Sequence, residues 1–139
     1  MDLRPTLLEQ ADLHDNIRAY VERFQLRSAI RVELVCTGEQ PLLPTTTVDH
    51  LYRVVQEALG NVARHARAEL VEIHLTYGEG ALRLSICDDG QGFDPEREVR
   101  EGQGLGMTTL RERIELLGGW LRINSTPGNG TALQMEIPY

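Results

Sequence analysis

The chain has 139 residues, and 41% of them are hydrophobic, which is enough to bury the core of one domain. Its formal net charge of -7 argues against nucleic acid or an anionic membrane as the main partner, because proteins that bind polyanions normally present a basic face. The cysteines lie far apart in apolar stretches and no apolar run is long enough to span a membrane, so we expect a soluble, cytoplasmic domain without a disulfide framework.

The first half of the chain predicts two helices with a strand between them. Apolar residues at helical spacing indicate a helix over 11–26, and the alternating segment 30–36 indicates a strand. The longest helix is predicted over 44–66, where the apolar side chains fall within roughly 120° of the helical wheel. This helix should therefore pack one face against the core.

The second half predicts two hairpins separated by a loop and a short helix. Segments 70–77 and 81–87 alternate as antiparallel strands, while 93–104 has too few apolar side chains to pack and predicts a mobile loop. A short helix follows over 107–117, and a hairpin over 120–137 closes the chain. The expected fold is one α/β domain, a two-layer sandwich whose mixed, mostly antiparallel sheet is covered on one face by about three helices.

The segment DDGQGF (88–93) places a carboxylate directly after a predicted strand. The oxygens of Asp88 only accept hydrogen bonds, so they suit the exocyclic amine of adenine better than the carbonyl of guanine. Gly90 and Gly92 would let the backbone approach a flat base. Taken alone, this segment is better explained by an ordinary Asp-Gly turn.

The segment GQGLGM (102–107) ends a polar stretch and opens a helix. Gly102, Gly104 and Gly106 would leave backbone N–H groups free for phosphate oxygens at the positive end of the helix dipole. A flexible hinge is the alternative for this segment. A dinucleotide fingerprint is excluded by context, because its glycines must follow a strand directly.

Three polar residues share an arc of roughly 60° on the long predicted helix: Glu57, Asn61 and Arg64. A solvated face is the ordinary explanation for such a group. The amide oxygen of Asn61 nevertheless suits Mg²⁺, which takes one or two protein oxygens and completes its octahedral shell with water and phosphate. Glu57 could hold a metal-bound water or act as a base, and Arg64 or His65 could reach a phosphate.

Taken in chain order, QEALGNVARHA (56–66), DDGQGF, GQGLGM and PGNGT (127–131) resemble the asparagine box and glycine boxes of the ATP-binding domain of sensor histidine kinases. The resemblance runs from about residue 2 to the end of the chain, and both ends are similar to the nitrate-sensor-like branch of these kinases. It implies a Bergerat-type fold of the superfamily that includes gyrase, with ATP held between the long helix and a lid.

The resemblance also implies residue roles. Asn61 would bind Mg²⁺ and act in catalysis together with Glu57, the polarising carboxylate, and Asp88 would read adenine with support from Thr131. Residues 93–106 would close over the phosphates, although Gln103 stands where the branch often has histidine. The implied nucleotide-binding residues are Asn61, Arg64, His65, Asp88, Gly90, Gly92, Phe93, Gly102, Gly104, Leu105, Gly106, Met107 and Thr131.

These kinases carry the phosphate-accepting histidine on a preceding two-helix dimerisation domain. His14 sits in a similar local motif, but the interval to Glu57 is too short for a helical hairpin and already contains a predicted strand. We therefore expect residues 1–8 to be the end of a dimerisation helix or a linker, and residues 9–139 to be the ATP-binding domain.

The predicted function is transfer of the γ-phosphoryl group of Mg-ATP to a histidine on a separate dimerisation domain, and from there to a response regulator. A free-standing serine kinase of the anti-sigma-factor type and an ATP-switched binding module remain alternatives. We expect the isolated domain to bind ATP and ADP but no nucleic acid, to be a monomer, and to show at most weak ATPase activity. It would act in the cytoplasm, on its own or as part of a membrane-bound sensor.

Overall fold

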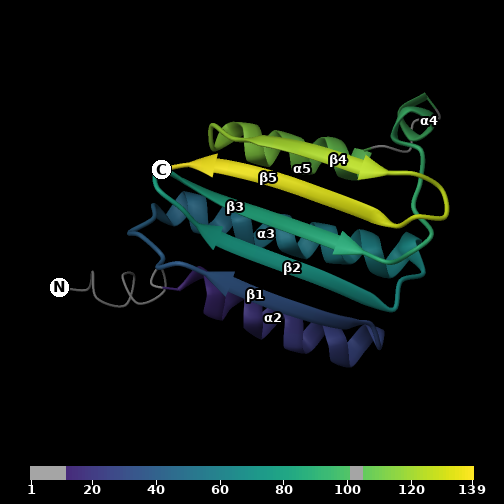
Figure 1. The fold of residues 1–139 in the computed structure, drawn as a ribbon, viewed down its shortest axis with the longest axis horizontal. Coiled ribbons are helices and arrows are strands. Elements are labelled where there is room, and N and C mark those ends of the chain that lie inside the picture. Colours follow the sequence, from purple (N-terminus) through teal and green to yellow (C-terminus); the bar gives the residue numbers. More distant parts are fainter. Residues whose placement is uncertain (1–11, 101–104) are drawn as a thin grey trace.

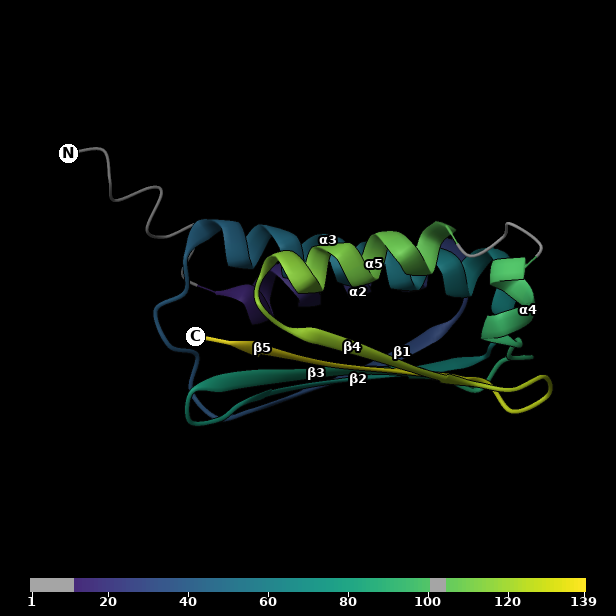
Figure 2. The same ribbon diagram turned by 90° about the horizontal axis from the view of Figure 1, so that it is seen from above.

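The computed structural model describes residues 12–100 and 105–139, which form a five-stranded sheet with a layer of helices on one face (Figures 1 and 2). The strand order across the sheet is β1-β2-β3-β5-β4. The β1–β2 pair is parallel and the other pairs are antiparallel, so the predicted mixed, mostly antiparallel sheet is confirmed. The strands are β1 (Arg31–Thr37), β2 (Leu70–Tyr77), β3 (Ala81–Asp88), β4 (Trp120–Ser125) and β5 (Thr131–Pro138).

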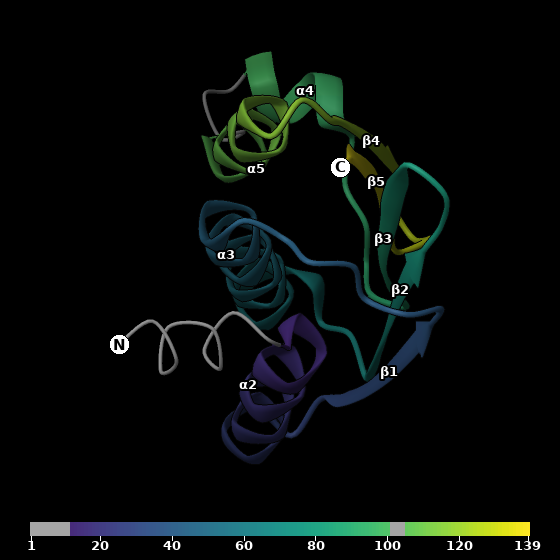
Figure 3. The ribbon, with the colours of Figure 1, turned by 90° about the vertical axis from the view of Figure 1, so that its left-hand side faces the viewer.

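Three long helices lie side by side on one face of the sheet and confirm the predicted two-layer sandwich (Figure 3). They are α2 (Leu13–Ser28), α3 (Thr45–Asn61) and α5 (Leu105–Leu116). A π-helical turn, η1 (Val62–Ala66), continues α3, and a short helix, α4 (Pro95–Arg100), lies beyond the end of the helix layer (Figure 2). None of the described helices is long and apolar enough to cross a membrane.

The core lies between the two layers and follows from the two periodicities of the sequence. Alternate side chains of each strand point to the helices, while those between them point to solvent on the open face. The helices contribute apolar stripes at a spacing of three and four residues. The best-buried core side chains include Leu13, Ile17, Leu51, Leu59, Val71, Ile73, Leu75, Leu82, Leu84, Leu110, Ile114 and Met135.

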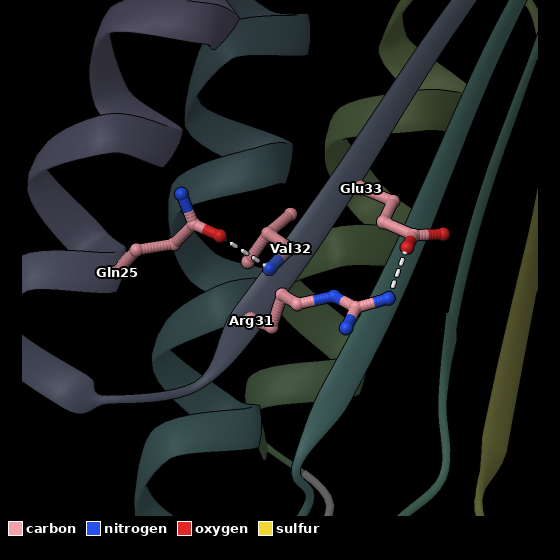
Figure 4. Close-up of polar contacts among 4 residues, drawn as sticks. All are labelled: Gln25, Arg31, Val32 and Glu33. Atoms are coloured by element: carbon pink, nitrogen blue, oxygen red, sulfur yellow. Dashed lines mark hydrogen bonds and ion pairs between the residues drawn. The ribbon is translucent and has the colours of Figure 1, made fainter.

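At the edge of the sheet, β1 pairs with β2 on one side only. Figure 4 shows that α2 covers part of the other side, because the Gln25 side-chain oxygen accepts a hydrogen bond of 2.7 Å from the backbone N–H of Val32. Next to it, the exposed side chains of Arg31 and Glu33 form an ion pair along the strand. A satisfied N–H and a charged pair both make an edge strand less able to pair with another chain.

Two elements differ from the prediction. The expected loop over 93–104 is wrong for 95–100, where α4 forms because Pro95 suits the first helical position and the Asp94 carboxylate accepts the N–H of Glu96 at 3.0 Å. The loop was predicted from the low apolar content alone, which takes no account of residues that favour the start of a helix. The long predicted helix changes at Val62 from α to π geometry and ends at Ala66, and the following Arg67 has a φ of 52°. The expected linker over 1–8 lies outside the described residues.

Candidate nucleotide-binding site

A cavity of about 760 Å³ lies where α3 ends, β3 ends and β5 begins, at the opposite end of the sheet from the chain's C-terminus (Figure 1). This volume falls within the usual range for small-molecule sites. The cavity brings together segments that are far apart in the sequence: the end of the long helix, the DDGQGF loop, the start of α5 and the start of β5. Its lining is Ala58, Asn61, Val62, Arg64, His65, Ala66, Arg67, Ile86, Asp88, Gln91, Gly92, Phe93, Met107, Thr131 and Leu133.

The lining combines apolar walls with polar groups. Ile86 and Leu133 come from neighbouring strands and are each 3% exposed, and Ala58 and Val62 face the cavity from the helix. Apolar surface of this kind suits the faces of a planar ring, and a few placed polar groups then fix its orientation.

Asp88 is the last residue of β3, opposite Thr131 of β5. One of its carboxylate oxygens accepts the N–H of Gly90 at 2.8 Å. Burial raises the pKa of this carboxyl group, although backbone N–H groups of Gly90 and Thr131 act in the opposite direction. The structure therefore places a half-buried acceptor at the cavity, as the sequence predicted.

The neighbouring Asp89 has a different part in the fold. It is fully exposed, and one oxygen accepts the N–H groups of Glu69 at 2.9 Å and Leu70 at 3.1 Å. These hydrogen bonds hold the pKa of Asp89 below its ordinary value. Asp89 ties the end of β3 to the start of β2 and is absent from the described cavity lining.

The glycines of the DDGQGF loop lie against other backbone segments. A Cβ atom at Gly90 would be 2.2 Å from the carbonyl oxygen of Ala66, and one at Gly92 would be 2.2 Å from that of Thr126. Gly92 also has a φ of 66°, which side chains disfavour. Backbone packing alone therefore requires glycine at both positions, whether or not a base binds here.

Asn61 and Arg64 both line the cavity, and Arg64 donates a hydrogen bond of 2.8 Å from Nη2 to Oδ1 of Asn61. The Asn61 amide oxygen thus already accepts a hydrogen bond from the Arg64 guanidinium at the wall of the cavity. Mg²⁺ needs few protein oxygens when phosphates supply others, so this oxygen fits as a single protein ligand. His65, on the same turn, also lines the cavity.

The Glu57 side chain contacts α5 and is not in the described lining of the cavity. Its Oε1 forms an ion pair of 2.8 Å with Nε of Arg113 on α5, and Nη1 of Arg113 lies 3.5 Å from Nδ1 of His50. The second oxygen of Glu57, Oε2, is buried and has no hydrogen-bond partner among the described residues. The structure thus brings Asn61 and Asp88 to one cavity, while Glu57 is absent from its described lining.

Residues 46–139 match the family described as histidine kinase-, DNA gyrase B- and HSP90-like ATPases. The chain belongs to this family. It is 30% identical over 138 residues to sensor histidine kinase LiaS of Bacillus subtilis and 31% identical over 138 residues to oxygen sensor histidine kinase NreB of Staphylococcus carnosus. These alignments cover 99% of this chain but 37% and 40% of the relatives, so the chain spans less than half of their length.

The fold is also that of a solved histidine kinase domain, from the blue-light activated kinase EL346 of Erythrobacter litoralis. The TM-score is 0.74 at 21% identity, covering 91% of this chain and 60% of the other. The predicted resemblance to the ATP-binding domain of sensor histidine kinases is confirmed, because the family matches and the named relatives are sensor histidine kinases.

The predicted phosphate loop of this ATPase domain is described only in part. Gly102 and Gly104 lie outside the described residues. Leu105 and Gly106 form the start of α5, and Met107 on its first turn lines the cavity. The expected closure of 93–106 over phosphates therefore stays a prediction.

Two residues that hold the candidate site together were not predicted from the sequence, Ser125 and Gln91. Ser125 accepts the N–H of Phe93 at 2.9 Å, donates to the carbonyl of Gly130 at 2.9 Å and lies 2.9 Å from the Thr131 hydroxyl. It joins the DDGQGF loop to the PGNG turn. The second residue, Gln91, joins the same loop to η1. No local pattern marks either residue, because the contacts with the DDGQGF loop and with η1 join segments that are more than 20 residues apart.

Proposed function

We propose that this chain is the catalytic, ATP-binding domain of a two-component sensor histidine kinase. In this reaction the bond from the γ-phosphorus to the bridging oxygen of ATP breaks, a phosphorus–nitrogen bond forms on a histidine of a dimerisation domain, and ADP leaves. A response regulator then takes the phosphoryl group. The observation that carries the proposal is the cavity, because Asp88, Asn61 and Arg64 line it together. The names of the relatives favour histidine as acceptor over the serine-kinase and ATP-switch alternatives.

The base end of the nucleotide is assigned to the sheet side of the cavity. Asp88 would accept a hydrogen bond from the exocyclic amine of adenine, and the Thr131 hydroxyl would lie on the same side. Ile86 and Leu133 would contact the faces of the ring through their buried apolar side chains. Guanine would present a carbonyl oxygen to Asp88, and two acceptors facing each other in a half-buried site are unfavourable.

The phosphate end is assigned to the end of α3. Asn61 would hold Mg²⁺ through Oδ1, and the bound ion would neutralise charge on the phosphates during transfer. Arg64 and His65 line the same wall and would supply donors to phosphate oxygens. Glu57 pairs with Arg113, so its role as the polarising carboxylate stays a prediction.

The acceptor histidine is assigned to the parent protein outside this chain, in the cytoplasm, and the isolated domain is expected to be a monomer. His14 does not suit the role, because it lies in the first turn of α2, a helix that packs on the sheet. Its Nε2 lies 3.2 Å from Nη2 of Arg18.

Calorimetry with ATP, ADP and GTP in the presence of Mg²⁺ tests the proposal. ATP and ADP should bind, and GTP should bind at least about tenfold more weakly, which corresponds to the loss of one hydrogen bond to a charged group. Asp88→Asn should lose at least about tenfold in ATP affinity for the same reason. Equal affinities for ATP and GTP would exclude the base-reading role of Asp88, and no binding of either would exclude the proposed function.

A further inference from the structure

Gln91, in the middle of the DDGQGF loop, lines the cavity and makes hydrogen bonds to two other segments of the chain. Its side-chain amide donates to the carbonyl of His65, and its backbone N–H donates to the carbonyl of Ala66 at 2.6 Å. Its own carbonyl accepts the N–H of Gly128 in the PGNG turn at 2.5 Å. One residue therefore connects η1, the DDGQGF loop and the β4–β5 turn.

The two carbonyls that Gln91 meets belong to the end of a helix. The last carbonyls of a helix have no partner within it, and here α geometry has already given way to the π turn η1. The loop meets this end closely, because a Cβ atom at Gly90 would be 2.2 Å from the carbonyl oxygen of Ala66. The contact leaves little room for another arrangement of the two backbones.

The segments joined in this way carry the groups assigned to opposite ends of the nucleotide. Arg64 and His65 lie on η1, which directly follows Asn61. Asp88 lies two residues before Gly90 on the loop side, at the end of β3. The spacing between the phosphate wall and the base wall is therefore set where Gln91 contacts η1.

We propose that Gln91 is a positioning residue that fixes the distance between Asp88 and the end of α3, and so tunes the affinity of the cavity for adenine nucleotides. The inference rests on the proposed function, since ATP is the ligand whose two ends must be matched. Gln91 acts through the backbone of η1, while Asp88 and Asn61 contact the ligand. The alternative is that its exposed side chain contributes nothing to binding.

Gln91→Met tests the inference, because methionine has a similar length but cannot donate to the His65 carbonyl, and both backbone hydrogen bonds remain. ATP and ADP affinities, measured by calorimetry with Mg²⁺, should each fall about fivefold, the effect of one neutral hydrogen bond. Gln134→Met is the matched control, since Gln134 is exposed on β5 and outside the described lining of the cavity. It should leave both affinities unchanged.

Hydrogen exchange of the protein without nucleotide supplies a second measurement. Amides of residues 62–67 should exchange faster in Gln91→Met than in the unmodified chain, and Gln134→Met should not change them. Gln91→Asn keeps the amide group, but its side chain is too short to reach the His65 carbonyl. It should behave like Gln91→Met in both measurements, and it replaces Gln91→Met if the methionine variant folds poorly.

The outcomes separate this inference from the proposed function. Failure of the unmodified chain to bind ATP would overturn both. Normal ATP binding that Gln91→Met leaves unchanged would overturn the inference alone. A loss of affinity without faster exchange at 62–67 would also overturn it, because Gln91 would then act as a direct ligand contact.

Discussion

Asp88 and Asp89 are neighbours in the sequence, yet the fold treats their carboxylates in opposite ways. Burial raises the pKa of Asp88, whereas the N–H groups of Leu70 and Glu69 lower that of exposed Asp89. A raised carboxyl pKa means that ionisation costs folding free energy, and a lowered one means that ionisation stabilises the fold. Asp88 therefore keeps a charge at the cavity at the expense of stability, while Asp89 stabilises the sheet.

We expect Asp88→Asn to raise the unfolding temperature at pH 7, because the substitution removes the charge that folding disfavours. The cost of this charge is fully present above the raised pKa and absent below the ordinary value of 3.8, so the difference should shrink as the pH falls toward that value. Thermal unfolding followed by circular dichroism between pH 7 and pH 4 measures it. Asp89→Asn is the control and should lower the unfolding temperature at pH 7. Destabilisation by both substitutions would contradict the assignment.

Asn61 is the residue through which metal and nucleotide binding should be coupled. Asn61→Ala should abolish the difference between ATP affinities measured with and without Mg²⁺, because no other described side chain is assigned to the metal. Calorimetry with and without Mg²⁺ measures this difference, and circular dichroism checks the fold. Asn124→Ala, at an exposed position on β4, should retain full metal dependence. Full dependence in Asn61→Ala would place the metal ligand elsewhere.

The helices α3 and α5 are joined by the ion pair between Glu57 and Arg113, whose side chains are 29% and 25% exposed. Arg113→Met would leave a partly buried carboxylate without its partner and should lower the free energy of unfolding by about 1–3 kcal/mol. Arg31→Met is the control, because both side chains of the Arg31–Glu33 pair are exposed and the pair should contribute below about 1 kcal/mol. Urea denaturation measures the free energy of unfolding of both variants. Equal losses would contradict the larger contribution predicted for the Glu57–Arg113 pair.

The strands and long helices could be predicted because each has a period that the sequence carries locally. The strand predicted over 70–77 has the same bounds as β2, since every second residue from Val71 to Leu75 is apolar and buried. Asp88 could be predicted because it directly follows a predicted strand, and Asn61 because it shares a polar arc with Glu57 and Arg64 on the long predicted helix. The ion pair of Glu57 with Arg113 and the contacts of Gln91 could not, because they join segments that only the finished fold brings together.

The long helices among the described residues all pack on the sheet, so none of them forms a separate helical hairpin that could carry the phosphate-accepting histidine. Radiolabelled ATP should therefore leave this chain unlabelled, while a separate dimerisation domain of the parent kinase, added to it, should become labelled on histidine. Autoradiography after gel electrophoresis measures the transfer. The control is His14→Gln, which should support transfer as well as the unmodified chain. Acid-labile label on this chain alone that is lost in His14→Gln would contradict the assignment.

The strand order also determines when the cavity can exist during folding. The β2–β3 and β4–β5 pairs are hairpins that close short loops, whereas the β3–β5 pair joins residues 81–88 to residues 131–138. Pairs of high sequence separation carry a larger loop-closure entropy and tend to form later. Asp88 faces Thr131 in this pair, so the base wall of the cavity depends on a pairing of high sequence separation. We therefore expect a nucleotide to stabilise the domain after this pair has formed, and not to serve as a template for the hairpins.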